Sequence, residues 1–490
     1  MTPLRLHNTM SGQTEEFTPL NAGQVRMYTC GPTVHDYAHI GNFRTFLFED
    51  LLRRVLIQQG YQVTQVMNLT DVEDRIIKKA GDKGITIDEF TEPYIEAFFE
   101  DLDTLRIERA EHYPRATQHI FEMVSLIEVL NEKGHTYVSD GSTYFRIATF
   151  PRYGRLAHLD VSGLKAGARV DVDDYGKDDP RDFVLWKARK PGEESWETPL
   201  GAGRPGWHIE CSAMSMKYLG ESFDIHTGGV DNIFPHHENE IAQSESATGK
   251  TFARYWLHAQ HLQDAVGEKM SKRLKNFSTL RDLLAEGYQP RAIRYALMTG
   301  AHYRSPLAFS PELLKAADSS VKRLDEFAVR LGPIPSAVVG EGQAGPIPSP
   351  FVGEGQGGPI PSPLVGEGQG GGLDVRQRWD DALRDDLNLP AAVGHLFEFI
   401  KAFNTRLESG KATPDERAAA MAMLRHANRI LDVIEFPQAL DAEVERMIAE
   451  RQAARDRRDF ARADEIRQQL LAMGIQLDDT KDGTRWKRIR

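Results

Sequence analysis

The sequence has few cysteines and no long apolar run. Only Cys30 and Cys211 occur among its 490 residues, which excludes a small fold held by several disulfides. No stretch approaches the roughly 18 consecutive apolar residues of a membrane-spanning helix, and the first eleven residues contain one basic residue and no signal-peptide core. We therefore expect a soluble, cytoplasmic protein without a membrane partner.

Basic residues are the minority among the charged ones. The chain has 60 Lys and Arg against 72 Asp and Glu, a net charge of −12, which disfavours a protein that coats nucleic acid. A local basic patch is still compatible with this balance, and residues 481–490 form one with five bases and one acid. The length suggests about three domains, and 40% hydrophobic residues suffice for large cores.

The first 68 residues contain the pattern of a β-α-β unit. Residues 25–29 form a short β-prone run, residues 43–59 have apolar side chains at helical spacing before Gly60, and residues 61–68 form the next β-prone run. Because such connections join parallel strands, we expect a parallel sheet with a site at the carboxyl ends of its strands.

Helices and a hairpin follow this unit. Thr70 and Glu73 form a capping-box pattern that predicts a helix start, and residues 87–130 are helical in character. Asp140-Gly141 lies between two β-prone runs, as in a tight hairpin turn.

Past residue 310 the sequence predicts a helical bundle, because apolar residues recur at helical spacing over 314–331, 393–407 and 418–434. Between the first two helices, GPIPS recurs every 13 residues, starting at Gly332, Gly345 and Gly358. These Gly- and Pro-rich copies have little to bury, so they fit a flexible linker rather than a solenoid. We interpret them as a tandem insertion and assign them no function.

Three segments have the chemistry to bind a nucleotide. His39-Ile40-Gly41-Asn42 stands where a loop enters the first helix, and a helix N-terminus attracts phosphate. The basic segment 269–273 (KMSKR) could clamp phosphates, and the Gly-rich turn 227–231 ends in an acid that could accept from ribose hydroxyls. Taken singly, each segment also fits a simpler role: a capping histidine, a solvated charge run or a plain turn.

A fourth set of residues has the chemistry of a metal site. His236 and Glu240 are four apart and would share a helix face, whereas His237 and Glu238 would point elsewhere. The free thiols Cys30 and Cys211 could complete a zinc site of two sulfurs, one nitrogen and one oxygen. Two buried unreactive thiols beside a helix with solvated acids remain the alternative.

Together these segments resemble the cysteinyl-tRNA synthetase family of the class I aminoacyl-tRNA synthetases. HIGN and KMSKR stand at the positions of that class's two ATP motifs. Family-specific segments occur in the family's order: MYTCGPTVHDYAHIGN, NLTDVEDRIIKKA, RPGWHIECSAMS, FDIHTGG and FPHHENEIAQSE. Three residues depart from the family motifs, namely Asn42 for His, Arg273 for Ser and Lys275 for a common Gly.

The resemblance implies an α/β fold, with a Rossmann-like parallel-sheet catalytic domain, an inserted lobe, a helical anticodon-binding bundle and a small C-terminal domain. The expected parts are a catalytic domain in two halves (1–113 and 204–252), an inserted lobe (114–203), a stem-contact region with the KMSKR loop (253–317), a tRNA-binding bundle (318–434) interrupted by the repeats at 332–372, and a C-terminal anticodon-recognition domain (435–490).

The resemblance also implies roles for individual residues. The catalytic residues would be His39, Asn42, Lys269 and Lys272. ATP would be contacted by His39, Gly41, Asn42, Asp231 and Lys272, with Mg²⁺ accompanying it. Cysteine would be bound by Thr70 and Trp207, and one Zn²⁺ per chain by Cys30, Cys211, His236 and Glu240. The tRNA would be bound by Arg485, Trp486, Lys487 and Arg488, although Trp486 could instead anchor a small core.

The implied reaction is the ATP-dependent activation of L-cysteine and its transfer to tRNA(Cys) by a monomeric enzyme, with zinc selecting the cysteine thiolate. A ligase that joins cysteine to an amino sugar, as in mycothiol biosynthesis, resembles the first 310 residues equally well. That family lacks a long helical and basic C-terminal portion, so it remains the alternative.

Deleting residues 332–371 is expected to leave tRNA charging nearly unchanged, because the free energy of loop closure depends only weakly on loop length. Steady-state charging by the deletion variant and the full chain measures this. A large loss in the variant would show that the repeats have a function.

Overall fold

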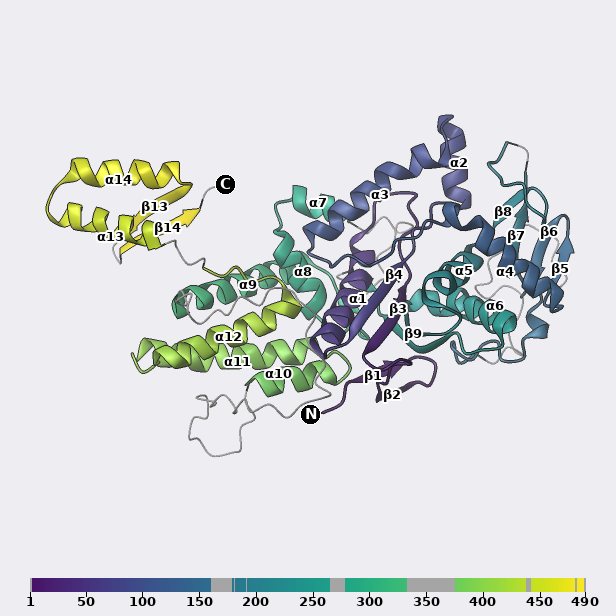
Figure 1. Cartoon of the computed structure of the whole chain (residues 1–490), viewed down its shortest axis with the longest axis horizontal. Coiled ribbons are helices and arrows are strands. Elements are labelled where there is room, and N and C mark those ends of the chain that lie inside the picture. The colour runs from purple at the N-terminus through teal and green to yellow at the C-terminus, as the bar shows by residue number, and fades with distance from the viewer. Residues whose placement is uncertain are drawn as a thin grey trace. The chain divides into compact units, whose positions relative to one another are not determined.

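A four-stranded parallel sheet organises the N-terminal part of the computed structural model (Figure 1). Its strand order is β10 (Ala253–Ala259), β9 (Phe223–Gly229), β3 (Gln24–Thr29) and β4 (Gln62–Met67). Helix α1 (Ile40–Gln58) connects β3 to β4 on one side, and α6 (Glu238–Thr248) connects β9 to β10 on the other. The connections therefore diverge between β3 and β9, and a crevice forms at the carboxyl ends of parallel strands at such a point.

The structure describes residues 2–159, 179, 181–190, 192–264, 278–332, 375–437, 442–480 and 483–488. They divide into two units: one holds the described residues of 1–327 and 346–434, the other those of 328–345 and 435–490. Within these residues, no helix is long and apolar enough to cross a membrane. The parallel-sheet fold class is confirmed, whereas the finer domain boundaries stay a prediction.

An antiparallel sheet forms a separate lobe of the first unit. Its strands, in order, are β5 (Thr136–Ser139), β6 (Ser142–Phe145), β7 (Phe183–Ala188) and β8 (Gly203–Pro205). The hairpin prediction is confirmed, because Asp140 and Gly141 both have positive φ, 47° and 76°, between β5 and β6. Helices α4 (Ile120–Glu132) and α5 (Trp207–Leu219) pack together next to this sheet.

Two helices follow β4 in the sequence, before the lobe begins: α2 (Asp74–Lys83) and α3 (Ile87–Thr104). The capping prediction at Thr70 is wrong, because Glu73 caps α2 and the Thr70 hydroxyl donates to Glu210 instead. The helical pattern over 87–130 is interrupted after Thr104, and residues 105–115 form a connection that pairs locally with β4 and its extension.

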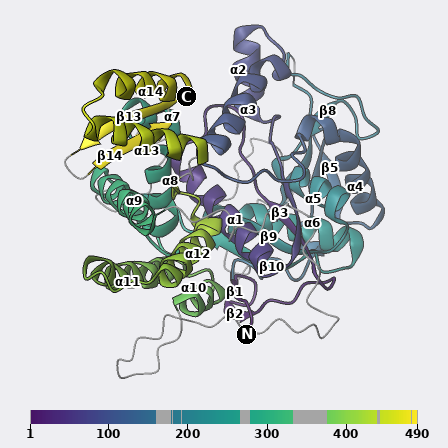
Figure 2. The same ribbon diagram turned by 60° about the vertical axis from the view of Figure 1, so that its left-hand side comes forward.

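The helices from the later part of this unit lie on one side of α1 (Figure 2). They are α7 (Leu280–Ala285), α8 (Pro290–Thr299), α9 (Pro311–Leu331, in this unit as far as Phe327), α10 (Val375–Arg384), α11 (Leu389–Glu408) and α12 (Pro414–Leu431). Their apolar faces bury Leu324, Leu396 and Ile430, so the predicted bundle is confirmed for its described residues. The repeat copies lie outside the described residues apart from Gly332.

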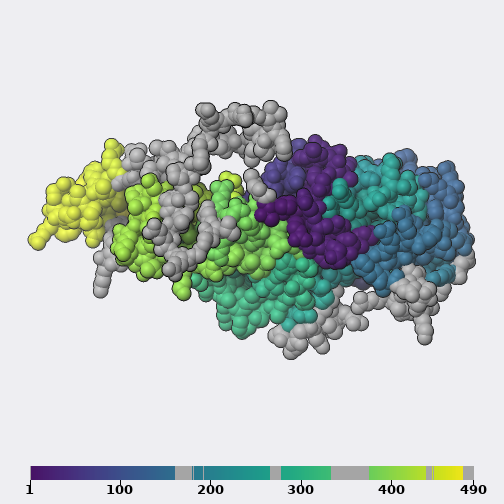
Figure 3. Space-filling model, turned by 90° about the horizontal axis from the view of Figure 1, so that it is seen from below, coloured from purple at the N-terminus to yellow at the C-terminus, as the bar shows by residue number. Residues whose placement is uncertain are grey.

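The N-terminal hairpin, β1 (Arg5–Asn8) and β2 (Gln13–Glu16), lies on the surface between the lobe and the bundle helices (Figure 3). The backbone N–H of His7 donates to Asp386 Oδ1 at 2.8 Å, so the chain start is attached to the turn between α10 and α11. A short parallel pair joins β11 (Leu262–Gln263) to β12 (Leu307–Ala308).

The second unit consists of α13 (Ala442–Asp456), α14 (Phe460–Ala472) and a hairpin of β13 (Ile475–Thr480) and β14 (Gly483–Arg488). Its core is small, with the buried side chains Val444, Ile466, Leu470, Ile475 and Leu477.

Buried charges attach α1 to the bundle. Asp50, in the middle of α1, accepts from Arg294 at 2.6 Å and from Arg54 at 2.9 Å, and all three side chains are almost inaccessible to solvent. Arg294 also donates to the Leu431 carbonyl at 2.7 Å, and Arg54 donates to the Arg429 carbonyl at 3.0 Å. The last carbonyls of α12, which lack partners within the helix, are therefore satisfied by cations from α1 and α8.

Arg294→Ala is expected to destabilise the protein by about 3 to 5 kcal/mol, because it removes one partner of a buried charge pair. Urea unfolding followed by circular dichroism measures the change. Arg189→Ala is the control, since Arg189 pairs with Glu197 on the surface at 3.5 Å and its loss should cost at most about 1 kcal/mol. Equal losses in both variants would contradict the importance of the buried cluster.

Candidate active site

A cavity of about 550 Å³ opens at the carboxyl ends of β3 and β9, where the sheet connections diverge. It is lined by residues from segments that lie far apart in the sequence: Cys30, His39, Gly41, Asn42, Thr70, Trp207, Cys211, Asp231 and His236. The predicted residues for ATP, cysteine and metal therefore share one cavity, apart from Lys269 and Lys272, which lie outside the described residues, and Glu240, which lies buried behind His236.

The N-terminus of α1 forms one wall of the cavity. The helix begins at Ile40, earlier than the predicted residue 43, because His39 is its N-cap. His39 Nδ1 accepts the Asn42 N–H at 3.2 Å, and Asn42 Oδ1 accepts the His39 N–H at 3.1 Å, a reciprocal cap. Since Nδ1 is an acceptor, this cap assigns the imidazole proton to Nε2, and Asn42 keeps its amide Nδ2 as a donor.

Four elements bring the predicted zinc ligands together. Cys30 follows β3, Cys211 lies on α5, His236 lies in the short helical turn before α6, and Glu240 lies on α6. One ligand atom of each of these four buried residues lies within 4.8 Å of the other three. The set combines two sulfurs with a nitrogen and an oxygen, which suits Zn²⁺.

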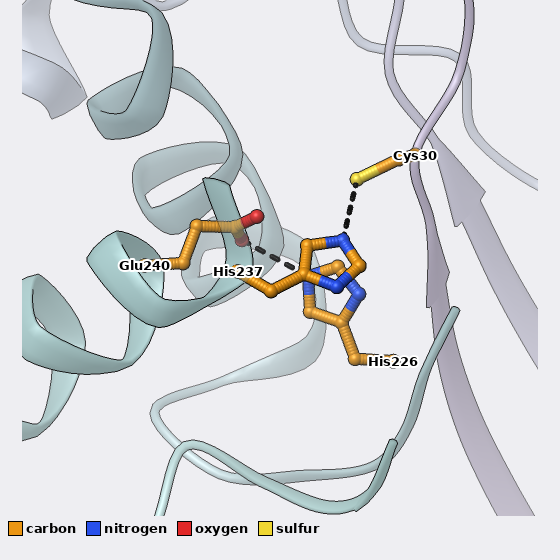
Figure 4. Close-up of side chains that lie close together, drawn as sticks. All are labelled: Cys30, His226, His237 and Glu240. Carbon is orange, nitrogen blue, oxygen red and sulfur yellow. Dashed lines mark hydrogen bonds and ion pairs between the residues drawn. The ribbon is translucent and has the colours of Figure 1, made fainter. Parts of the chain in front are cut away.

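A second buried set shares two of these residues. Cys30, His226, His237 and Glu240 also place one ligand atom each within 4.8 Å of one another (Figure 4). In this set, His237 Nε2 lies 3.3 Å from Cys30 Sγ, and His226 Nε2 lies 2.9 Å from Glu240 Oε2. The expectation that His237 points away from the metal ligands is therefore wrong, because the chain does not follow one regular helix through Phe234.

Hydrogen bonds favour the first set as the metal site. Glu240 Oε2 is taken by His226, while the buried Oε1 lacks a hydrogen bond although His236 Nε2 is 3.1 Å away. His236 Nδ1 is bonded to His208 Nδ1 at 2.9 Å, so its Nε2 is the nitrogen directed at the same point. Outer partners of this kind fix the orientation of metal ligands, and a cation beside Oε1 would satisfy the orphaned oxygen.

The electrostatics of the first set also fit a divalent cation. A hydrogen bond from the Cys30 thiol lowers the pKa of Cys211 and raises the pKa of Cys30. Burial opposes protonation of His236, but Glu240 and Cys211 raise its pKa to about 10. Burial alone would raise the pKa of Glu240, but His226 and His236 lower it to about 2. A bound Zn²⁺ would replace the protons that balance these buried anions.

A chain of hydrogen bonds positions Thr70 at the cavity. Asn68 Oδ1 accepts the Gly31 N–H at 2.9 Å, and Asn68 Nδ2 donates to Thr70 Oγ1 at 3.1 Å. Thr70 in turn donates to Glu210 Oε2 at 3.1 Å, so its hydroxyl oxygen is oriented to accept from a bound ligand. Trp207 also lines the cavity, with its ring centroid 4.4 Å from that of His236, and 39% of the residue is exposed.

The other predicted residues fall in two groups. Asp231 follows β9 in a short turn that lines the cavity. The residues predicted to bind tRNA lie on β14, of which only the backbone is described: Arg485, Trp486, Lys487 and Arg488.

Sequence reasoning missed the residues that support the site. His208 and His226 form hydrogen bonds with His236 and Glu240, from which they are 28 and 14 residues away in the sequence. Asn68 bonds Thr70 only two residues further on. Gly31 was also missed, although its place directly after Cys30 is a local signal. A Cβ at Gly31 would come within 1.8 Å of the Asn68 carbonyl oxygen, so the close approach of β3 and β4 requires glycine there.

Comparisons with known proteins agree with this geometry. The model of the tRNA synthetases class I (C) catalytic domain matches residues 16–319, that of the DALR domain matches 378–435, and that of the Cysteinyl-tRNA ligase anticodon binding domain matches 438–486. The fold is similar to that of methionyl-tRNA synthetase from Mycobacterium tuberculosis, with a TM-score of 0.55 over 84% of this chain and 90% of that one at 14% identity. Fold and site thus define a class I aminoacyl-tRNA synthetase.

Full-length relatives narrow the assignment. The chain is 50% identical to the cysteine–tRNA ligase of Solibacter usitatus, over 99% of each chain. It is 45% identical to that of Brachyspira hyodysenteriae, over 100% of each chain. The chain belongs to the cysteinyl-tRNA synthetase family.

Gly31→Ala is expected to lower both the bound zinc and the cysteine-dependent activity at least tenfold, because the methyl group forces the Cys30 loop away from Asn68. Elemental analysis and pyrophosphate exchange measure the two effects. Gly81→Ala on α2 is the control, since a Cβ there meets no atom within 4 Å. Unchanged zinc and activity in Gly31→Ala would show that the close approach is not needed.

Proposed function

We propose that this protein activates L-cysteine with ATP and transfers the cysteinyl group to the 3′ end of tRNA(Cys). The observation that supports this most is that the N-terminus of α1 and three members of the buried Cys, Cys, His and Glu set line one cavity at the switch point of the sheet, with Glu240 directly behind His236. A metal set alone would fit many enzymes, and an ATP motif alone would fit any member of the class.

Cys30, Cys211, His236 and Glu240 are the residues that would hold one zinc ion. When bound, zinc supplies a Lewis acid that prefers a thiolate to the hydroxyl of serine, and it makes the thiolate accessible at neutral pH. A difference of about 5 to 7 kcal/mol between the two donors would give selection of about 10⁴ to 10⁵, which makes a separate editing domain unnecessary. Trp207 and Thr70 would enclose the remainder of the amino acid.

The chain's own residues position the nucleotide. His39 Nε2 and the Gly41 N–H in the first turn of α1 would donate to phosphate oxygens as negative charge develops on them, since the Ile40 and Asn42 N–H groups already donate to the Ser278 carbonyl and His39 Nδ1. Asn42 can donate through Nδ2, so its replacement of the family's histidine preserves a donor at that position. Lys269 and Lys272 would neutralise the phosphates of Mg-ATP, and Asp231 would accept from the ribose.

In-line attack of the cysteine carboxylate on the α-phosphate then gives cysteinyl-adenylate and pyrophosphate, and the 3′-terminal ribose hydroxyl displaces AMP. The binding of tRNA would use the bundle and the second unit, with Arg485, Lys487 and Arg488 at phosphates and Trp486 at an unpaired base. We further propose a monomer that acts in the cytoplasm.

The alternative ligase, which joins cysteine to an amino sugar, is not favoured. Both the DALR and the anticodon-binding matches cover the C-terminal portion that the alternative does not require. Exchange of labelled pyrophosphate into ATP that depends on L-cysteine, followed by charging of tRNA(Cys), tests the proposal. Exchange without charging would favour the alternative, and the absence of exchange would refute both.

Cys211→Ser is expected to lower zinc content and cysteine-dependent exchange together, by at least tenfold, because an alcohol is a poor zinc ligand. His226→Gln should retain most of the zinc, since we place His226 behind Glu240 and not on the metal. Met214→Leu, a buried and volume-conserving change on the same helix as Cys211, is the control. Loss of zinc in His226→Gln with full retention in Cys211→Ser would instead support the second set.

A further inference from the structure

Arg75 is the only Lys or Arg among the described residues that line the active-site cavity. It is the second residue of α2, and 69% of its side chain is exposed. The three substrates of the proposed reaction, ATP, L-cysteine and tRNA, each carry negative charge where they meet the protein. A cation that lines the cavity is therefore suited to bind one of them.

The start of α2 is attached to the lobe at the side of the cavity. Asp74 pairs with Arg204 of β8 at 2.5 Å and with Lys187 of β7 at 3.2 Å. Glu73 caps the helix by accepting the Arg75 N–H at 2.9 Å. These contacts place the backbone of Arg75 beside the lobe.

The guanidinium, by contrast, is only weakly held. Its Nε forms an ion pair with Glu73 Oε1 at 3.6 Å, and the guanidinium is largely solvated. An exposed pair of this kind contributes little to stability, so it does not explain why a cation stands here.

The position distinguishes between the substrates. ATP phosphates are assigned to the N-terminus of α1, and the cysteine side chain to the metal set. The tRNA differs from ATP and cysteine because only its 3′ end can enter the cavity. The phosphates that precede the terminal nucleotide must therefore pass the rim of the cavity. Asp36 also lines this cavity and would repel them, which a solvated cation at the edge would offset.

We propose that Arg75 binds a phosphate of the 3′-terminal nucleotides of tRNA as they enter the cavity beside the lobe. This inference rests on the proposed function. Arg75 then acts in the transfer half of the reaction and not in cysteine activation.

The first test compares the two half-reactions in Arg75→Gln. Cysteine-dependent pyrophosphate exchange should stay within twofold of the wild type, whereas kcat/KM for tRNA(Cys) charging should fall about tenfold, the effect of one charged hydrogen bond. Lys78→Gln is the matched control, because Lys78 is exposed on the same helix but does not line the cavity. Arg75→Lys keeps the charge and should recover part of the loss.

Two outcomes would overturn the assignment. An equal fall in exchange and charging would place Arg75 at ATP or cysteine, and no fall in either would leave it without a role. Absence of exchange in the wild type would refute the proposed function itself, so the two failures are distinguishable.

The second test uses binding and separates a contact from a structural effect. The wild type should bind complete tRNA(Cys) more tightly than tRNA lacking its last two nucleotides, and Arg75→Gln should lose most of that difference. The slope of log Kd against log salt concentration for the complete tRNA should also fall by about 0.7, the value for one phosphate of a single strand. An unchanged preference for the complete tRNA would contradict the contact.

Discussion

The site depends on the cost of burying sulfur and carboxylate groups from separate elements at one point. Cys30, Cys211 and Glu240 are almost inaccessible to solvent, and anions in such surroundings are stable only beside a compensating positive charge. Glu240 and Cys211 raise the pKa of His236 to about 10, so without a metal ion its protonated ring would supply that charge. Zn²⁺ would supply more of it and would satisfy the orphaned Glu240 oxygen. The fold supports this arrangement through a second layer of histidines, since His208 and His226 each occupy the atom of a candidate ligand that faces away from the centre.

Helix α1 connects this site to the bundle. Its first residue follows His39, which faces the cavity, and Asp50 lies almost three turns further along. Asp50 pairs with Arg294 of α8 and with Arg54 of α1 itself. Both arginines also donate to backbone carbonyls at the end of α12. The element that we propose to bind phosphate is thus the same one that attaches the helical portion. The position of the helix start relative to the bundle is therefore fixed by buried polar bonds, which allow less freedom of orientation than apolar contacts.

The sequence could predict much of this fold because local patterns decide local structure. The β-α-β spacing predicts β3, α1 and β4, and Asp140-Gly141 predicts the hairpin, whose positive φ values suit those residues. Boundaries were less accurate where polar side chains compete for caps. Thr70 has the spacing of an N-cap, but its hydroxyl bonds Asn68, its neighbour in the sequence, and Glu210, which the tertiary structure brings to it.

The candidate ligands could be proposed from residue type and family resemblance, whereas their supporting residues could not. His236 and Glu240 are four apart, but His208 and His226 reach them from other elements, and the His237 ring turns toward Cys30 because the backbone departs from helical geometry at Phe234. A role for Arg75 can likewise be inferred only from the cavity that it lines. Spacing in the sequence contains no information on such contacts.

X-ray absorption at the zinc edge, recorded before and after L-cysteine is added to the zinc-loaded protein, tests the central claim most directly. The account predicts two sulfur ligands that become three with L-cysteine and stay two with L-serine. A sulfur number that does not change with L-cysteine would contradict it.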